Sequence, residues 1–145
     1  MERFFLYIEN MENIIHLITP KKATYFLDEN STVRQALEKF DAHKFTTIPL
    51  LDENGKYKGT LSEGDILRFI KNNCNFDIKI AETVKISDIP HYRPYKSMRV
   101  DATFDEIYVL SLEQNFIPIT DDYDTYIGIV KRKDVLLELK NITSK

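Results

Sequence analysis

The residues best suited to bind a small ligand lie in two similar segments, GTLSEGD at 59–65 and GIVKRKD at 128–134. In each segment a short apolar run leads into a predicted helix, and an aspartate follows in the first turn. A helix start of this kind attracts anions, because its backbone N–H groups are free and the helix dipole is positive there. An aspartate at this position could also accept hydrogen bonds from both hydroxyls of a ribose. The alternative is that Ser62 and Asp65 only cap their helix.

The second segment places three cations, Lys131, Arg132 and Lys133, at its helix start. The helix dipole disfavours each cation there by about 0.3–1 kcal/mol at low salt. A bound phosphate would reverse this penalty, and an arginine can hold a phosphate through two hydrogen bonds. A solvated basic patch is the alternative, because salt and water screen the repulsion. The pattern favours a phosphate site, with Asp134 placed to meet a ribose.

Both segments belong to an internal repeat, which must position them. Residues 48–50 (IPL) and 117–119 (IPI) are separated by 69 positions, as are Gly59 and Gly128. The predicted organisation is an N-terminal extension at 1–16, a first repeat at 17–72, a linker at 73–85 and a second repeat at 86–145. A repeat of this length indicates two similar structural units.

Each repeat predicts the order strand, helix, strand, strand, helix. In the first repeat, Thr32 and Gln35 form a capping-box pattern at the start of the first helix, and Asn54-Gly55 marks a tight hairpin turn. Thr103 and Glu106 repeat the capping box in the second. The predicted strands lie at 25–27, 48–51, 57–61, 116–120 and 126–130, and the predicted helices follow Thr32, Ser62, Thr103 and residue 130.

Composition narrows the class of protein. The chain has 145 residues, 43% of them hydrophobic and 30% charged, which is typical of a soluble globular protein. A net charge of -3 argues against a general nucleic-acid binder. The single cysteine, Cys74, excludes an internal disulfide and a cysteine-based zinc site. The N-terminus has no signal-peptide pattern and is too short in apolar residues to span a membrane, so we expect a cytoplasmic protein without membrane attachment.

The segments TVRQAL (32–37), FTTIPLLD (45–52) and GTLSEGDIL (59–67) resemble the CBS domain, and the resemblance extends over about residues 17–141. CBS domains occur as tandem pairs called Bateman modules. The resemblance implies an α/β (α+β) fold in which two β-α-β-β-α repeats pack with pseudo-two-fold symmetry, their sheets back to back. It also implies a ligand containing adenosine, such as AMP, ADP, ATP, S-adenosylmethionine or cyclic di-AMP. Lys131 departs from the family pattern, which has serine or threonine at that position.

The resemblance further implies two clefts, each built from both repeats. In site A, Thr46 and Thr47 would bind an adenine edge, and the cations would bind phosphate. In site B, Phe116 would either stack on a base or fill the pocket, and core or interface packing is the alternative for both Phe116 and Tyr95. Site A comprises Thr19, Lys22, Thr24, Tyr25, Thr46, Thr47, Lys131, Arg132 and Asp134, and site B comprises Thr60, Ser62, Asp65, Arg93, Tyr95, Lys96, Asn115 and Phe116.

The predicted function is a regulatory module that senses an adenine nucleotide and signals to an unidentified effector protein, most simply as a homodimer. Small free-standing CBS proteins of this kind include receptors for cyclic di-AMP. A ligand-free dimerisation or scaffold module is the alternative, which Lys131 favours. No nucleophile–histidine pattern, metal-ligand spacing or P-loop indicates an enzyme, so no catalytic residue, metal or cofactor is expected. His16, His43 and His91 are interpreted as structural or surface residues.

Overall fold

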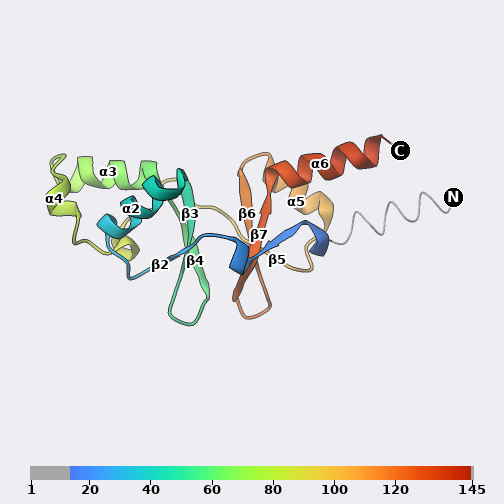
Figure 1. Ribbon diagram of the computed structural model, residues 1–145, viewed down its shortest axis with the longest axis horizontal. Coiled ribbons are helices and arrows are strands. Elements are labelled where there is room, and N and C mark those ends of the chain that lie inside the picture. Colours follow the sequence, from blue (N-terminus) through green and yellow to red (C-terminus); the bar gives the residue numbers. More distant parts are fainter. Residues whose placement is uncertain (1–13, 145) are drawn as a thin grey trace. The chain divides into compact units, whose positions relative to one another are not determined.

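The computed structural model describes residues 14–144, so most of the predicted N-terminal extension lies outside the described residues (Figure 1). The chain forms two compact units. We call Tyr25–Pro94 the central unit. The terminal unit combines the residues up to Thr24 with those from Tyr95 onward. The described part of the chain contains no helix that is both long and apolar enough to cross a bilayer.

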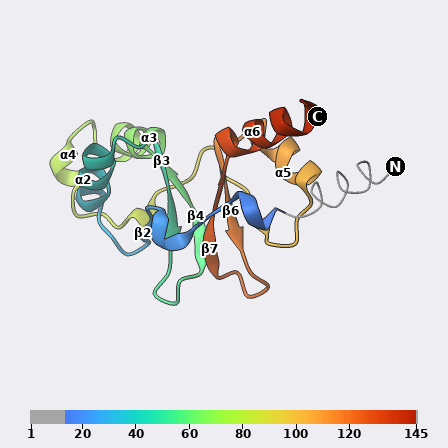
Figure 2. The same cartoon turned by 45° about the vertical axis from the view of Figure 1, so that its right-hand side comes forward.

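The central unit confirms the order predicted for a repeat. It contains β2 (Leu27–Asp28), α2 (Val33–His43), β3 (Thr47–Leu51), β4 (Tyr57–Ser62) and α3 (Glu63–Asn73). Strand β2 runs parallel to β3, and β3 pairs antiparallel with β4. Helices α2 and α3 lie side by side next to this sheet (Figures 1 and 2).

Helix α2 starts and ends where its sequence directs. The Thr32 hydroxyl accepts a hydrogen bond from the Gln35 N–H at 3.2 Å, and the Gln35 side chain accepts one from the Thr32 N–H at 2.9 Å. This confirms the predicted capping box. The helix ends at Lys44, whose left-handed backbone (φ 56°) stops it. Its apolar face closes a core made of Leu27, Val33, Ala36, Phe40, Ile48, Leu50, Leu61 and Ile66.

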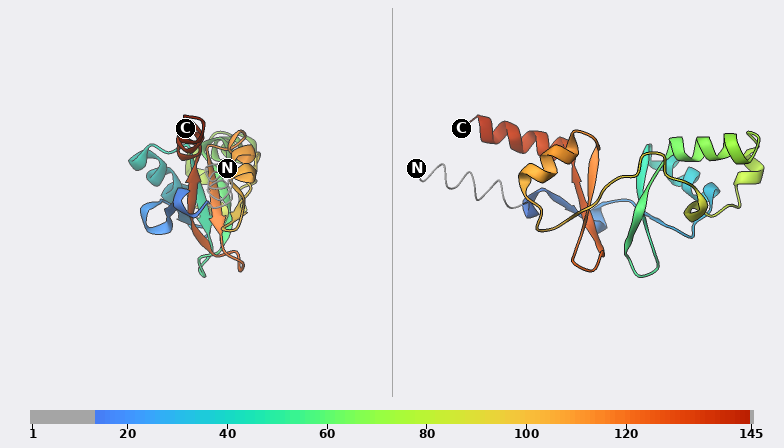
Figure 3. Two further views of the ribbon diagram at one scale, coloured as in Figure 1. Left: turned by 90° about the vertical axis from the view of Figure 1, so that its right-hand side faces the viewer. Right: turned by 180° about the vertical axis from the view of Figure 1, so that it is seen from behind.

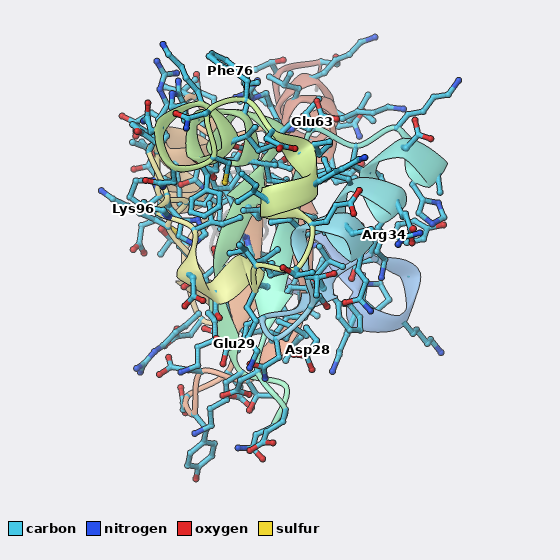
Figure 4. All side chains as sticks on the ribbon, turned by 90° about the vertical axis from the view of Figure 1, so that its left-hand side faces the viewer. Asp28, Glu29, Arg34, Glu63, Phe76 and Lys96 are labelled. Carbon is cyan, nitrogen blue, oxygen red and sulfur yellow. The ribbon has the colours of Figure 1, made fainter. Side chains whose placement is uncertain are left out.

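Within the central unit, the chain after α3 turns back toward the start of α2. Asn75 and Phe76 both have left-handed backbone, and Phe76 is exposed at the surface beyond α3 (Figure 4). A short helix, α4 (Ile78–Ala81), follows, and η3 (Ile86–Asp88) is a single 3-10 turn. The Val33 N–H donates to the Val84 carbonyl, and the Ile86 N–H donates to the Ser31 carbonyl. The segment predicted as a linker, 73–85, is therefore part of the central unit and bonds the start of α2.

The terminal unit repeats this order and adds one strand. It contains β5 (Met98–Arg99), α5 (Phe104–Ser111), β6 (Phe116–Thr120), β7 (Tyr126–Lys131) and α6 (Arg132–Thr143). Helices α5 and α6 pack against each other (Figure 3). The strand that the sequence did not predict is β1 (Ile18–Pro20), flanked by the 3-10 turns η1 (Ile15–Leu17) and η2 (Lys21–Ala23). It pairs antiparallel with β7 and gives the sheet order β1-β7-β6-β5.

A glycine makes the β1–β7 pairing possible. Gly128 has a φ of +158°, and a Cβ built there would lie 2.1 Å from the Thr19 carbonyl oxygen. Any larger residue would push β1 away from β7. Gly59 holds the same position in the first repeat, with a φ of +133°, but a Cβ there would meet the His91 ring at 3.4 Å. The two equivalent glycines therefore face different neighbours.

Candidate functional site

The start of α3 is closed by its own capping box. Ser62 is the N-cap residue, and its hydroxyl accepts a hydrogen bond from the Asp65 N–H at 3.0 Å. The Asp65 Oδ2 atom accepts one from the Ser62 N–H, also at 3.0 Å. The two residues that the sequence marked as a phosphate and ribose site thus satisfy each other.

The second oxygen of Asp65 is also occupied. Oδ1 accepts a hydrogen bond from the Tyr92 N–H at 3.0 Å, and the His91 Nδ1 lies 3.8 Å from Oδ2. Only 3% of Asp65 is exposed. Thr60 is equally buried, with its hydroxyl 2.7 Å from the Tyr57 hydroxyl. Arg93 is exposed. Each oxygen of the Asp65 carboxylate therefore accepts a hydrogen bond from the protein itself.

The start of α6 differs at each of these points. Lys131 is the N-cap residue and its side chain makes no capping bond. Asp134 is half-buried and has no hydrogen bond or ion pair to any residue in the described part of the chain. Lys131 and Lys133 are exposed. This helix start therefore retains uncapped N–H groups and a carboxylate that can accept hydrogen bonds.

Arg132 is anchored at one end only. Its Nε donates to the carbonyl of the buried Ser111 at 2.7 Å, and its backbone N–H donates to the Asn115 carbonyl at 2.9 Å. Within residues 14–144, the two terminal nitrogens of its guanidinium have no hydrogen-bond partner. Fixing Nε reduces the flexibility of the side chain and leaves those two nitrogens to bind an anion.

The aromatic residues of site B pack together in the terminal unit. Phe116 is buried, pairs with Lys131 across the sheet, and has its ring centroid 5.0 Å from that of Tyr95. The Tyr95 hydroxyl donates to the Asn115 side chain. The buried Gln114, which sequence reasoning missed, bonds the backbone of Lys96 through both its oxygen and its nitrogen. A polar residue two positions before an apolar strand was the only signal for it.

The N-terminal residues of site A, Thr19 and Thr24, lie beside earlier residues of β7 and not beside Lys131 at its end. Thr19 pairs with Ile129, and the Thr24 hydroxyl lies 2.8 Å from that of Tyr126, the first residue of β7. Lys131 is the last residue of β7. Burial raises the pKa of the Tyr126 phenol above its ordinary value, and the hydrogen bond to Thr24 partly offsets this. Lys22 is exposed in η2. The structure therefore separates Thr24 from Arg132 along the strand.

The remaining site A residues belong to the central unit. Thr47 pairs with Ser62, and the Thr46 carbonyl accepts a hydrogen bond from the Glu63 N–H. The exposed Tyr25 ring lies 4.2 Å from the His43 ring, which sequence reasoning did not include. The expectation that these residues share a ligand with Lys131 and Arg132 stays a prediction. No three His, Cys, Asp or Glu side chains of residues 14–144 are placed to hold a metal ion.

Several solved structures share this fold. A CbpB structure in complex with c-di-AMP has a TM-score of 0.85 at 16% identity, and the match covers 99% of this chain and 96% of that one. A CBS domain protein from Streptococcus pneumoniae has a TM-score of 0.82 at 18% identity, with the same coverage. CBSX2 in complex with AMP, a protein from Arabidopsis thaliana, has a TM-score of 0.71 at 22% identity, covering 90% of this chain and 98% of that one.

A comparison with curated proteins found no match. The family model for the CBS domain matches twice, at residues 13–72 and 86–141. These two segments contain both helix starts and all the strands of both sheets. Because the matches cover most of the chain and the fold agrees with solved tandem pairs, the chain belongs to the CBS-domain family and contains two CBS domains.

Proposed function

We propose that this protein is a non-catalytic regulatory module that binds an adenine nucleotide and signals its occupancy to a partner protein. The observation that carries the proposal is the uncapped start of α6, where Arg132 is fixed through Nε and Asp134 has no described partner. Two proteins of the same fold were solved with c-di-AMP and with AMP, which supports an adenine nucleotide as the ligand class.

The chemistry of the α6 start suits a phosphorylated nucleoside. The free backbone N–H groups and the terminal nitrogens of Arg132 would bind phosphate oxygens, and Lys131 and Lys133 add positive charge. Asp134 would accept hydrogen bonds from ribose hydroxyls. A carboxylate here weakens the attraction for a bare anion, so its presence favours a ligand with hydroxyl donors as well as phosphate. The site B residues around Asp65 are proposed as a second, weaker site.

Isothermal titration tests this proposal with AMP, ATP and c-di-AMP, and with GMP and c-di-GMP as base controls. We expect an adenine ligand to bind more tightly than its guanine counterpart, and binding to weaken with added salt. Asp134→Ala should weaken binding if the carboxylate holds a ribose. It should strengthen binding if the site only attracts anions. Asp105→Ala, which removes an exposed first-turn carboxylate of α5, is the matched control. Unchanged or improved affinity in Asp134→Ala would contradict the proposal.

Homodimerisation is the proposed mode of assembly. Large apolar side chains are exposed on α5, on α6 and at the residue that ends α5, namely Val109, Leu136 and Leu112, of which Leu112 is 64% exposed. Burying such side chains stabilises an interface by about 25 cal/mol per Å² of apolar area before the costs of association are subtracted. Light scattering at tens of micromolar, an order-of-magnitude choice for weak association, should show a dimer. Leu136→Glu should shift it toward monomer.

A further inference from the structure

His91 and Tyr92, which follow η3 in the chain, lie across the start of α3, and we call this pair the strap. The Tyr92 N–H donates to Asp65 Oδ1 at 3.0 Å. The His91 Nδ1 lies 2.7 Å from the Thr60 carbonyl oxygen. Because a carbonyl oxygen can only accept, the His91 Nδ1–H is the donor of this hydrogen bond. The strap therefore takes up acceptors at the end of β4 and on the first turn of α3.

The Tyr92 side chain extends this contact along α3. Its ring centroid lies 4.4 Å from the Arg68 guanidinium carbon, close enough for a cation–π interaction. Its hydroxyl accepts a hydrogen bond from the Asn72 side chain at 3.2 Å. Asp65, Arg68 and Asn72 are spaced as i, i+3 and i+7, so they share one face of the helix. The strap is thus bound over two turns of α3.

Within residues 14–144, no such strap lies over the second repeat. Asp134, which is equivalent to Asp65, has no described partner. The position equivalent to Arg68 is Leu137, an uncharged residue that cannot form a cation–π interaction. The His91 ring also packs against Gly59, whereas the equivalent Gly128 is covered by the β1 backbone. One carboxylate of the pair is therefore occupied by the chain itself, and the other is open to a ligand.

We infer that the strap is an autoinhibitory element, which occupies the hydrogen-bond acceptors of the first repeat that a second nucleotide would need. This inference rests on the proposed function and adds a rule of occupancy to it. One nucleotide binds at the α6 start, and the α3 start accepts another only when the strap is released. A site that is open for a fraction of the time binds more weakly by that fraction. A strap closed 99% of the time would weaken the α3 site on the order of 100-fold.

The test is titration of the full chain with AMP, reading both stoichiometry and affinity. We expect the wild type to bind one AMP per chain in the accessible concentration range. The double variant His91→Ala/Tyr92→Ala keeps the N–H of residue 92 but loses the side chains that hold it against α3. It should therefore bind two AMP, with the second site tightened at least about tenfold and the first unchanged. Adding Asp65→Asn to the double variant should remove only the second site. Tyr123→Ala, which removes an exposed aromatic ring from the β6–β7 turn, is the matched control.

Because the double variant alters packing near buried residues, Arg68→Ala/Asn72→Ala provides a milder release. Both side chains are exposed, Arg68 lies over the Tyr92 ring, and Asn72 donates to the Tyr92 hydroxyl. This variant should tighten the second site by a smaller factor. Two equal sites in the wild type, or one site in every variant, would overturn the strap while leaving the proposed function intact. Absence of binding in every protein would overturn both.

Discussion

The two helix starts have the same sequence pattern, but they differ in how many of their hydrogen-bonding groups are already bonded within the protein. At α3, Ser62 and Asp65 cap each other and Tyr92 binds the remaining carboxylate oxygen. At α6, Lys131 cannot cap, and Asp134 has no partner in the described part of the chain. The residue type at the N-cap position accounts for much of the difference. A serine hydroxyl accepts a hydrogen bond from a first-turn N–H, whereas a lysine side chain has no acceptor.

This comparison separates stability from binding. A carboxylate whose oxygens are satisfied within the protein stabilises the fold, and removing it leaves unsatisfied N–H groups. A carboxylate without partners contributes little to the fold and remains able to bind a ligand. We therefore expect substitutions at equivalent positions of the two repeats to have different effects, and the predictions below run from the largest effect to the smallest.

The largest effect is expected at the two equivalent glycines. Gly128→Ala places a Cβ 2.1 Å from the Thr19 carbonyl oxygen, and a paired strand must move to relieve this contact. We expect the free energy of unfolding to fall by about 3 kcal/mol. Gly59→Ala meets only the His91 ring at 3.4 Å and should cost about 1–2 kcal/mol through backbone strain. Urea unfolding measures both, and equal losses would show that β1 yields easily.

The two aspartates should reverse roles between stability and binding. Asp65→Ala leaves the Ser62 and Tyr92 N–H groups without their acceptor and should cost about 2–3 kcal/mol of stability. Asp134→Ala should cost less than about 0.5 kcal/mol, as for a surface substitution. Nucleotide affinity should respond in the opposite order, with Asp134→Ala the more damaging. Thermal unfolding and titration of the same two variants test this, and a large loss of stability in Asp134→Ala would contradict it.

The sequence predicted the local part of this comparison and missed the non-local part. The capping boxes at Thr32 and Thr103 were predictable because each lies within four consecutive residues. Strand β1 was not, because its three residues show no alternating pattern and its partner β7 is more than 100 positions away. The strap was missed for the same reason. Asp65 and Tyr92 are 27 positions apart, and only the turn of the chain after α3 brings them together.

The site residues divide in the same way. The lack of a cap at Lys131 follows directly from its side chain, and the structure agrees. The anchoring of Arg132 by the Ser111 carbonyl required knowledge that α5 ends beside the start of α6. Sequence pattern therefore identified which groups are present, whereas the fold decided which of them remain free.

Arg132 is expected to dominate phosphate binding at the α6 start. Arg132→Ala should weaken nucleotide binding by about 1.5–3 kcal/mol, as expected for loss of a charged hydrogen bond. Lys133→Ala removes the same charge from an exposed neighbour and should cost well under about 1 kcal/mol. Titration at two salt concentrations separates a fixed contact from general attraction. Equal losses in the two variants would indicate that only total charge matters.

The smallest effect tests the origin of the difference directly. Lys131→Ser installs the N-cap of α3 at α6, where residue 131 already has the extended backbone that Ser62 uses (φ -84° against -110°). The new hydroxyl should accept the Asp134 N–H, and the Asp134 carboxylate should bind the residue 131 N–H. We expect stability to rise by about 0.5–1 kcal/mol.

Nucleotide affinity should fall in this variant, because Asp134 is then engaged and one cation is lost. Lys131→Ala removes the same cation without supplying a cap, so the difference between the two variants isolates the capping box. Lys131→Ser should exceed Lys131→Ala in thermal stability and bind nucleotide more weakly. If the two variants have equal stability and affinity, the N-cap residue does not explain why the Asp65 carboxylate is hydrogen-bonded within the protein and the Asp134 carboxylate has no described partner. The strap would then be the remaining cause, since it acts on Asp65 independently of Ser62.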